Sequence, residues 1–136
     1  MIEVERTVGR MLIGGEWSEA ADGRTIEVES PGNRTVIGEA PRGGAADVDR
    51  AVEAAAAAFA GWKRTPPRER GRMISRIAED LQADVEGLGR LVAAETGNAI
   101  RTQARPEART TADLFRYFGG LGGELKGETI DRKSVV

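Results

Sequence analysis

The sequence predicts an α/β protein, with short strands in the first forty residues and about four helices after them. Two observations support this prediction. Between residues 11 and 41, short apolar runs alternate with glycine, proline and asparagine turn signals, which is typical of strands. From Ala45 onward, apolar residues recur every three or four positions, which is the period of an amphipathic helix.

The predicted strands begin with a hairpin. Met11-Leu12-Ile13 is a short apolar segment, and Glu16-Trp17-Ser18 is its expected partner. Gly14-Gly15 lies between them and permits a tight turn, because glycine tolerates positive φ.

A second turn and two further strands follow. Asp22-Gly23 is the turn signal, placed before residues 25–29, which alternate polar and apolar side chains strictly. This alternation predicts a strand with one buried face. Residues 30–33 break the strand, and a further strand is expected at residues 35–38.

The first predicted helix starts at Ala45 and ends at Gly61-Trp62. Asp47 and Asp49 fall in its first turn, where carboxylates favour the positive end of the helix dipole. Alanines fill residues 54–58, so another element can approach this helix closely. Its apolar stripe consists of Val48, Ala51, Val52, Ala55, Ala56 and Phe59.

Two further helical segments follow. Thr65 offers a capping hydroxyl, and Pro66-Pro67 suits a first turn. Asp84 restarts the chain as a third helix that stops at Gly97. The pattern leaves open whether these are two helices or one bent helix, although Gly87 and Gly89 favour a break. The expected buried residues are Met73, Ile74, Ile77 and Leu81, then Val85, Leu88, Leu91 and Val92.

The last long helix is predicted to open at Pro106. Its apolar stripe is Ala112, Phe115, Phe118 and Leu125. The glycines at 119, 120, 122 and 123 weaken its end and allow close contact there. Residues 129–136 resemble the start of a strand.

Composition restricts the possible chemistry. The 136 residues carry 20 basic and 22 acidic side chains, a net charge of −2, which gives no electrostatic case for a nucleic acid or an anionic membrane. No apolar run spans a bilayer and no signal pattern opens the chain, so a cytoplasmic location is expected. The sequence contains no cysteine and no histidine. Thiolate catalysis, disulfides, serine triads and histidine metal sites are therefore excluded for these 136 residues.

Several other features have both a functional and a structural interpretation. The glycine run 119–123 resembles a phosphate cradle, but it lacks a following Lys-Ser/Thr and sits at a helix end, so close packing is the better interpretation. The arginines suggest an anion patch, but Glu107 and Asp113 interrupt the region, so a solvated face is the better interpretation. The aromatic residues are expected to anchor cores. These arginines are Arg101, Arg105, Arg109 and Arg116, and the aromatics are Trp17, Trp62, Phe115, Tyr117 and Phe118.

A series of segments in order resembles the opening quarter of NAD(P)-dependent aldehyde dehydrogenases. The resemblance runs from Met11 to about Ile130. It is carried by LIGGEWSEA, by GGAADVDRAVEAAAAAF, by TPPRERGRMISRIAEDLQADVEGLGRLVAAETGN, and by AETGNAIRTQARPEARTTADLFRYFGGLGGELKGETI. Each segment alone is weak, whereas their order and tight spacing are specific to the family.

The resemblance implies a three-layer α/β enzyme that uses NAD or NADP. It divides the chain into an N-terminal extension (1–10), N-terminal strands (11–41), the helical part of a dinucleotide-binding domain (42–130) and a truncated tail (131–136). In the family, a cysteine thiolate attacks the aldehyde, hydride passes to the nicotinamide, and a glutamate-activated water hydrolyses the thioester. Those groups belong to later sequence, so the resemblance assigns no catalytic and no cofactor-binding residue here.

One family site carries over in part. Many relatives hold a monovalent cation near the corresponding strand end, and the matching positions are the backbone carbonyl of Glu29 and the carboxylate of Glu95. This chain has Ser30-Pro31 where relatives have Asn-Pro, and a solvated strand residue and a helix-end carboxylate explain both glutamates without an ion.

The resemblance also sets expectations for activity and partners. The isolated chain is expected to be inactive, and its expected partner is the remainder of the dehydrogenase or a full-length subunit of this oligomeric family. Two alternatives remain open: a non-enzymatic interaction or regulatory module, and one subunit of a split dehydrogenase.

Overall fold

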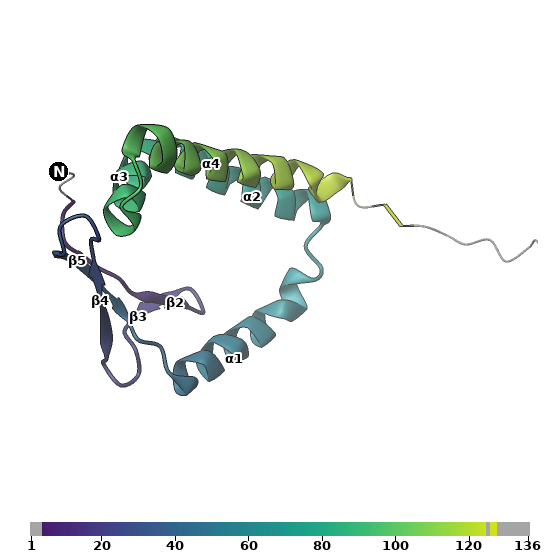
Figure 1. The fold of residues 1–136 in the computed structure, drawn as a ribbon. Helices are drawn as coiled ribbons and strands as arrows, with labels where there is room; N and C mark the ends of the chain where they lie inside the picture. The colour runs from purple at the N-terminus through teal and green to yellow at the C-terminus, as the bar shows by residue number, and fades with distance from the viewer. Residues whose placement is uncertain (1–3, 125, 128–136) are drawn as a thin grey trace, which may run out of the picture.

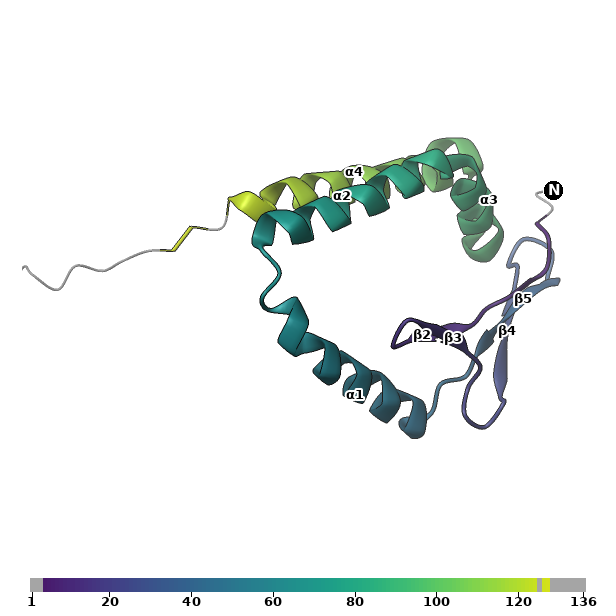
Figure 2. The same cartoon turned by 180° about the vertical axis from the view of Figure 1, so that it is seen from behind.

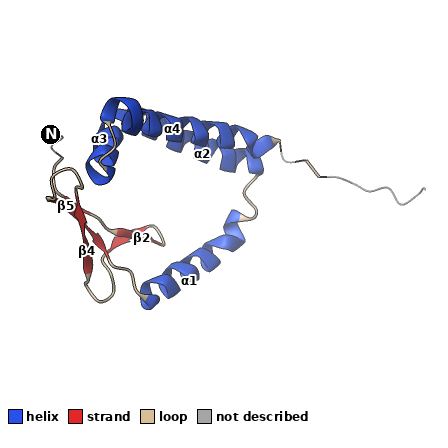
Figure 3. Ribbon diagram, viewed as in Figure 1, coloured by secondary structure: helices blue, strands red, loops and turns tan. Residues whose placement is uncertain are grey.

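The computed structural model of the chain describes residues 4–124 and 126–127, in which strands come first and helices follow (Figure 1, Figure 3). The predicted α/β class and element order are confirmed. The predicted stripe residue Leu125, the expected strand start at 129–136 and the tail at 131–136 lie outside the described residues. The strands are β1 (Thr7–Val8), β2 (Met11–Ile13), β3 (Glu16–Ser18), β4 (Thr25–Glu29) and β5 (Val36–Pro41).

The strands form two small sheets. In the three-stranded sheet, β5 lies in the centre, parallel to β1 and antiparallel to β4. Gly38 is the register partner of both Thr7 and Val28, and a β-bulge separates Val28 from Glu29. The second sheet is the antiparallel β2–β3 hairpin, in which Leu12 faces Trp17.

The predicted glycine turns are confirmed. Gly14 and Gly15 close the hairpin with φ values of 62° and 88°, and Gly23 has a φ of 67° before β4. These angles are costly for residues that carry a Cβ atom. The one buried face expected for β4 is only half formed, because Val28 is half-buried while Ile26 is 52% exposed. No helix covers Ile26 in the described part of the chain. Polar and apolar residues therefore alternate along β4, but the apolar face is not fully buried.

Helix α1 (Ala45–Trp62) has the predicted bounds and forms an arm that diverges from the other helices (Figure 1, Figure 2). It packs beside the hairpin through small residues. A Cβ atom on Gly14 would lie 3.6 Å from Ala54 Cβ, and one on Gly43 would lie 3.4 Å from Met11 Sδ. The predicted close approach to the alanine run is therefore confirmed. The apolar stripe lies on another side of the helix, where Val48 and Phe59 are both 58% exposed.

The second and third predicted helices are separate. Helix α2 (Pro67–Ala83) and helix α3 (Val85–Thr96) are divided at Asp84, where φ is −115° and ψ is 28°. The break therefore lies before Gly87 and Gly89, not at them. Gly97 ends α3 in the left-handed conformation, with φ at 75°, as predicted.

The predicted cap of α2 is wrong. Pro66, not Thr65, holds the N-cap position, and no side chain donates or accepts a capping hydrogen bond. The Pro66 carbonyl instead accepts the N–H groups of Glu69 and Arg70, at 2.9 and 3.1 Å. Pro67 has no N–H to satisfy, so the first turn needs no hydroxyl there.

Helix α4 (Arg105–Gly120) begins one residue before the predicted Pro106, which lies in its first turn. A π-helical turn, Ile100–Ala104, leads into it, and a 3₁₀ turn, Leu121–Gly123, follows it. Neither short turn was expected, because the sequence signals fix the start and end of a helix better than its local hydrogen-bonding pattern.

Helices α2 and α4 lie side by side and form the main packed layer (Figure 1, Figure 2). Their backbones almost touch, since a Cβ atom on Gly71 would collide with the carbonyl oxygen of Gly119, and one on Gly122 would lie 2.7 Å from the carbonyl of Pro67. The predicted close contact at the glycine run is therefore confirmed at Gly119 and Gly122. The buried apolar side chains of the described helices are small: Ala78, Val85, Ala93, Ala94, Ala104, Ala108 and Ala112.

Val85 and Ala112 are buried as predicted, but the close approach overturns the predicted burial of several larger stripe residues. Met73 and Ile77 are 39% and 44% exposed, and Phe118 is 57% exposed. The five aromatic residues expected in cores lie at the surface instead. Helices that approach at backbone distance leave room only for alanine and glycine between them, so larger side chains point outward. The exposed aromatics are Trp17, Trp62, Phe115, Tyr117 and Phe118.

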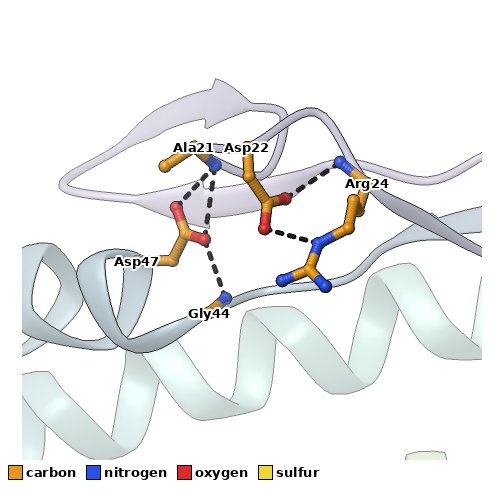
Figure 4. A network of polar contacts seen from close by, with 5 residues as sticks. All are labelled: Ala21, Asp22, Arg24, Gly44 and Asp47. Atoms are coloured by element: carbon orange, nitrogen blue, oxygen red, sulfur yellow. Dashed lines mark hydrogen bonds and ion pairs between the residues drawn. The ribbon is translucent and has the colours of Figure 1, made fainter.

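Asp47 links the hairpin to the start of α1 (Figure 4). Its side chain is only 4% exposed. The carboxylate accepts the N–H of Gly44 at 2.9 Å, as part of a helix capping arrangement, and the N–H of Ala21 at 3.0 and 3.3 Å. It also pairs with Arg50 at 2.9 Å. One carboxylate therefore joins two segments 26 residues apart in sequence.

These contacts favour the ionised form of Asp47. The Gly44 N–H lowers the pKa of this carboxyl most, the Ala21 N–H and Arg50 lower it further, and burial opposes them. Beside it, the backbone N–H and side chain of Arg24 lower the pKa of Asp22, with Nε of Arg24 at 2.6 Å (Figure 4). The negative charges are thus held by donors that exist only when the turn and helix start are folded.

We expect Gly71→Ala to destabilise the fold by about 1–3 kcal/mol, the usual range for overpacking a tight contact. The added methyl group meets the backbone of Gly119, which cannot rotate away. Gly120→Ala is the matched control, because nothing lies within 4 Å of its Cβ position. The control should be neutral or stabilising by about 0.4–1 kcal/mol. Urea midpoints measured by circular dichroism check both values, and equal midpoints for the two variants would contradict the packing described.

We also expect Asp47→Asn to lower the urea midpoint more than Asp49→Asn does. Both variants remove a carboxylate from the first turn of α1, but only Asp47 accepts the N–H of Ala21. Since folding lowers the pKa of Asp47, its stabilisation is complete above the unfolded value of about 3.9 and is lost as the pH falls through the lower folded value. The gap between wild type and Asp47→Asn should therefore be wide at neutral pH and narrow in acid. A gap that is constant with pH would contradict a role for the charge.

Candidate functional site

A small hollow of about 160 Å³ lies between the three-stranded sheet and α3. Strand β5 forms one side of it, and Leu91 and Glu95 of α3 form the other. Glu39, which also lines the hollow, forms an ion pair with Arg6. The full set of lining residues is Thr7, Gly9, Val28, Ile37, Gly38, Glu39, Ala40, Leu91 and Glu95.

The structure brings the two predicted cation-site segments into one neighbourhood. Glu95 lines the hollow, and so does Val28, the residue before Glu29. The end of α3 also approaches the turn after β4, because a Cβ atom on Gly97 would lie 3.2 Å from Pro31 Cγ. The β-bulge at Val28/Glu29 interrupts the regular pairing of this strand.

The Glu29 carboxylate itself has a different role. It forms an ion pair with Nε of Arg34 at 2.9 Å, across the turn that joins β4 and β5. Only its backbone carbonyl is left for the predicted site. Among the described residues, no group of three or more acidic, histidine or cysteine side chains is arranged to hold a metal ion. Glu29 and Glu95 therefore provide at most a partial ligand set.

Two of the four arginines that suggested an anion patch form ion pairs with carboxylates of the chain. Arg105 pairs with Glu86 of α3 at 2.7 Å, and Arg116 pairs with Asp113 at 2.7 Å. The Arg105 side chain lowers the pKa of the Glu86 carboxyl, against the opposing effect of desolvation. The first pair ties α3 to the start of α4, and the second lies on a solvated face, as the structural interpretation predicted.

The described surface carries many large apolar side chains. In α1, Val48, Val52, Phe59 and Trp62 are between 46% and 61% exposed. Near the end of α4, Leu114, Tyr117 and Phe118 are at least 50% exposed, and the rings of Tyr117 and Phe118 meet edge to face at 5.2 Å. Exposed apolar surface on this scale is typical of interfaces. No helix in the described residues is both long and apolar enough to cross a membrane.

Comparison with known proteins agrees with the geometry. A sequence model of the aldehyde dehydrogenase family matches residues 17–135. An aldehyde dehydrogenase of Aspergillus niger is 35% identical over 134 residues, which covers 98% of this chain and 27% of that protein.

Solved structures match equally well. The NAD-dependent aldehyde dehydrogenase of Sinorhizobium meliloti superposes with a TM-score of 0.89 at 36% identity, covering 95% of this chain and 26% of that one. PnpE, solved in complex with nicotinamide adenine dinucleotide, gives a TM-score of 0.87 at 35% identity, with 93% and 26% covered. The chain belongs to the aldehyde dehydrogenase family and spans about a quarter of the length of the relatives it matches.

Proposed function

We propose that this chain supplies the outer strands and helices of the dinucleotide-binding domain in an NAD- or NADP-dependent aldehyde dehydrogenase of the cytoplasm. The single observation that carries the proposal is the family match along nearly the whole chain, at about a quarter of each relative's length. In this proposal, residues 1–10 form an N-terminal extension, residues 11–41 supply the strands, residues 42–130 supply the helical layer, and residues 131–136 are the tail of the chain.

The chemistry of the family requires groups that these 136 residues do not contain. A thioester mechanism needs a cysteine thiolate, and the sequence has no cysteine. The proposal therefore assigns the chain a structural part: its helices support the nucleotide-binding sheet, while the nucleophile, the general base and the cofactor contacts come from other sequence. Alone, the chain should neither bind the cofactor tightly nor oxidise aldehydes.

The exposed apolar faces support this role. A stripe containing Val48, Val52 and Phe59 at more than half exposure is costly in water, and a neighbouring sheet or helix would remove the cost. The same faces support a second candidate, an interaction module that docks onto a full-length subunit. In both cases the partner is a dehydrogenase polypeptide.

We propose further that the hollow beside α3 holds a monovalent cation in the complete enzyme. The Glu95 carboxylate and the Glu29 backbone carbonyl would contribute two oxygens, and the family's remaining ligands would complete the shell. The proximity of Gly97 to Pro31 and the bulge beside Glu29 support this assignment. Oxygen donors are the ligands that hard cations prefer.

A chimera tests the main proposal. The quarter of the Sinorhizobium meliloti enzyme that matches this chain is replaced by the chain itself, and reduction of NAD is followed with a panel of aldehydes. We expect the chimera to reduce NAD and the isolated 136-residue chain to show no turnover. A well-folded chimera without activity would contradict the shared role. Turnover by the isolated chain would refute the structural assignment, whereas an inactive isolated chain that co-purifies with the intact enzyme would favour the interaction module.

The cation site predicts a specific effect of Glu95→Gln in the same chimera. We expect potassium or sodium to raise the thermal midpoint relative to choline chloride of equal ionic strength, because a ligand that binds only the folded state stabilises it. Glu95→Gln should abolish this difference. Glu79→Gln, which removes an exposed carboxylate from α2, should preserve it. A response that is identical in both variants would exclude Glu95 as a ligand.

A further inference from the structure

Three arginines lie along one side of α2 and are called the arginine row here: Arg68, Arg72 and Arg76. Their spacing of four residues places them one above the other on the helix surface. All three are exposed. In the part of the chain that the structure describes, no carboxylate lies within ion-pair distance of any of them.

This arrangement is unfavourable for the isolated helix. Like charges four residues apart repel each other on a helix surface. Glu69, Glu79 and Glu124 line hollows beside the row, but none forms an ion pair with it. Helix α2 as a whole carries four arginines and three carboxylates, so the positive charge is concentrated only along the row. The repulsion would be relieved by carboxylates supplied from elsewhere.

The row borders two concave surfaces. Arg68 and Arg72 line a hollow of about 330 Å³ with Ser75, Glu124 and glycines at the end of α4. Arg72 and Arg76 line a second hollow of about 510 Å³ together with Met73. Arg72 and Ser75 line both hollows, so the two hollows adjoin along one face of α2, and a flexible anionic chain could reach the guanidinium groups from either of them.

We propose that the arginine row is an interaction surface for a carboxylate-rich polypeptide segment. A guanidinium group binds a carboxylate through two parallel N–H donors, so three arginines in a row favour a partner with several acidic side chains. The proposed function suggests the source of this segment, which is the part of the dehydrogenase outside the matched quarter, and this assignment rests on that function. The arginine row itself lies entirely on α2 and does not depend on that assignment.

The surroundings favour a polypeptide over a nucleic acid or an anionic bilayer. Glu69 and Glu79 lie beside the row and repel any anionic partner, so the partner must place its charges opposite the arginines and away from these two glutamates, which the fixed spacing of a phosphate backbone does not allow. A polypeptide can place its carboxylates opposite the arginines and avoid these two glutamates. Met73 and Ile77 are also 39% and 44% exposed on the same helix. Apolar side chains of a protein partner can cover them, which a phosphate backbone cannot do.

The test measures binding of a fluorescent glutamate-rich peptide to the 136-residue chain at low salt. Arg68→Gln with Arg72→Gln should weaken binding about tenfold, since two charge-assisted contacts are lost. The matched control is Arg42→Gln with Arg101→Gln, which removes the same charge from two exposed arginines outside α2. The control should change binding by less than about twofold. Circular dichroism verifies that both variants keep the helices, and Arg68→Lys with Arg72→Lys keeps the charge if either glutamine variant unfolds.

Every outcome of this binding assay either supports or overturns the proposed interaction surface. Loss of binding in the row variant alone supports the surface, as does partial retention in the lysine variant. Equal loss in both glutamine variants, or no binding by the wild-type chain, overturns it. So does tighter binding to duplex DNA or to phosphatidylserine vesicles than to the peptide. The assay contains no NAD and no aldehyde, so its failure leaves the chimera result standing, and an inactive chimera leaves this surface standing.

Discussion

The close approach of α2 and α4 is the constraint on which the rest of the structure depends. At Gly71 and Gly119 the two backbones are separated by less than the room a single methyl group requires. Helices held this closely can bury only small side chains between them, and Ala78, Ala108 and Ala112 fill that space. The core of this layer is therefore made of backbone and alanine. Among the described residues, no large side chain is fully buried.

The close approach of α2 and α4 also explains why large apolar side chains are exposed on these helices. Because the helix interface accepts only alanine and glycine, the phenylalanines of α4 and the methionine and isoleucine of α2 lie outside it. Helix α1 has an equivalent asymmetry, since Ala54 and the buried Asp47 face the hairpin while Val52 and Phe59 face solvent. A surface of this kind suits a layer that covers other structure. It agrees with a chain that matches about a quarter of each aldehyde dehydrogenase and contains no nucleophilic cysteine.

The charged side chains act through local ion pairs and hydrogen bonds, because the net charge of the chain is small. Asp47 fixes the start of α1 to the hairpin, and Arg105 fixes the start of α4 to α3 through Glu86. These pairs act inside the described structure. The arginine row has no such partner there, and it lies beside exposed apolar side chains. The internal pairs therefore set the relative placement of the elements, and the unpaired charges mark a surface available to a partner.

The sequence alone determined the order of the longer elements and the bounds of several of them, because those signals are local, although it did not predict β1 or the two short turns beside α4. Gly14, Gly23 and Gly97 require backbone angles that favour glycine, and Pro67 suits only the first turn of a helix. The family resemblance was also readable from segment order. For the candidate site, the resemblance to the family named Glu29 and Glu95, and the spacing of four in the arginine row is visible in the sequence.

Only the tertiary structure decided which side of each helix is buried. The hydrophobic pattern favoured Phe115 and Phe118, but burial depends on how closely a second helix approaches. The glycines at 71 and 119 set that distance, although they are 48 residues apart in sequence. Likewise, Gly44 and Asp47 signal a helix start, yet the hydrogen bond from Ala21 requires the hairpin to fold back onto α1. Local signals specify φ, ψ and periodicity. Contacts between distant segments arise only when the chain is packed.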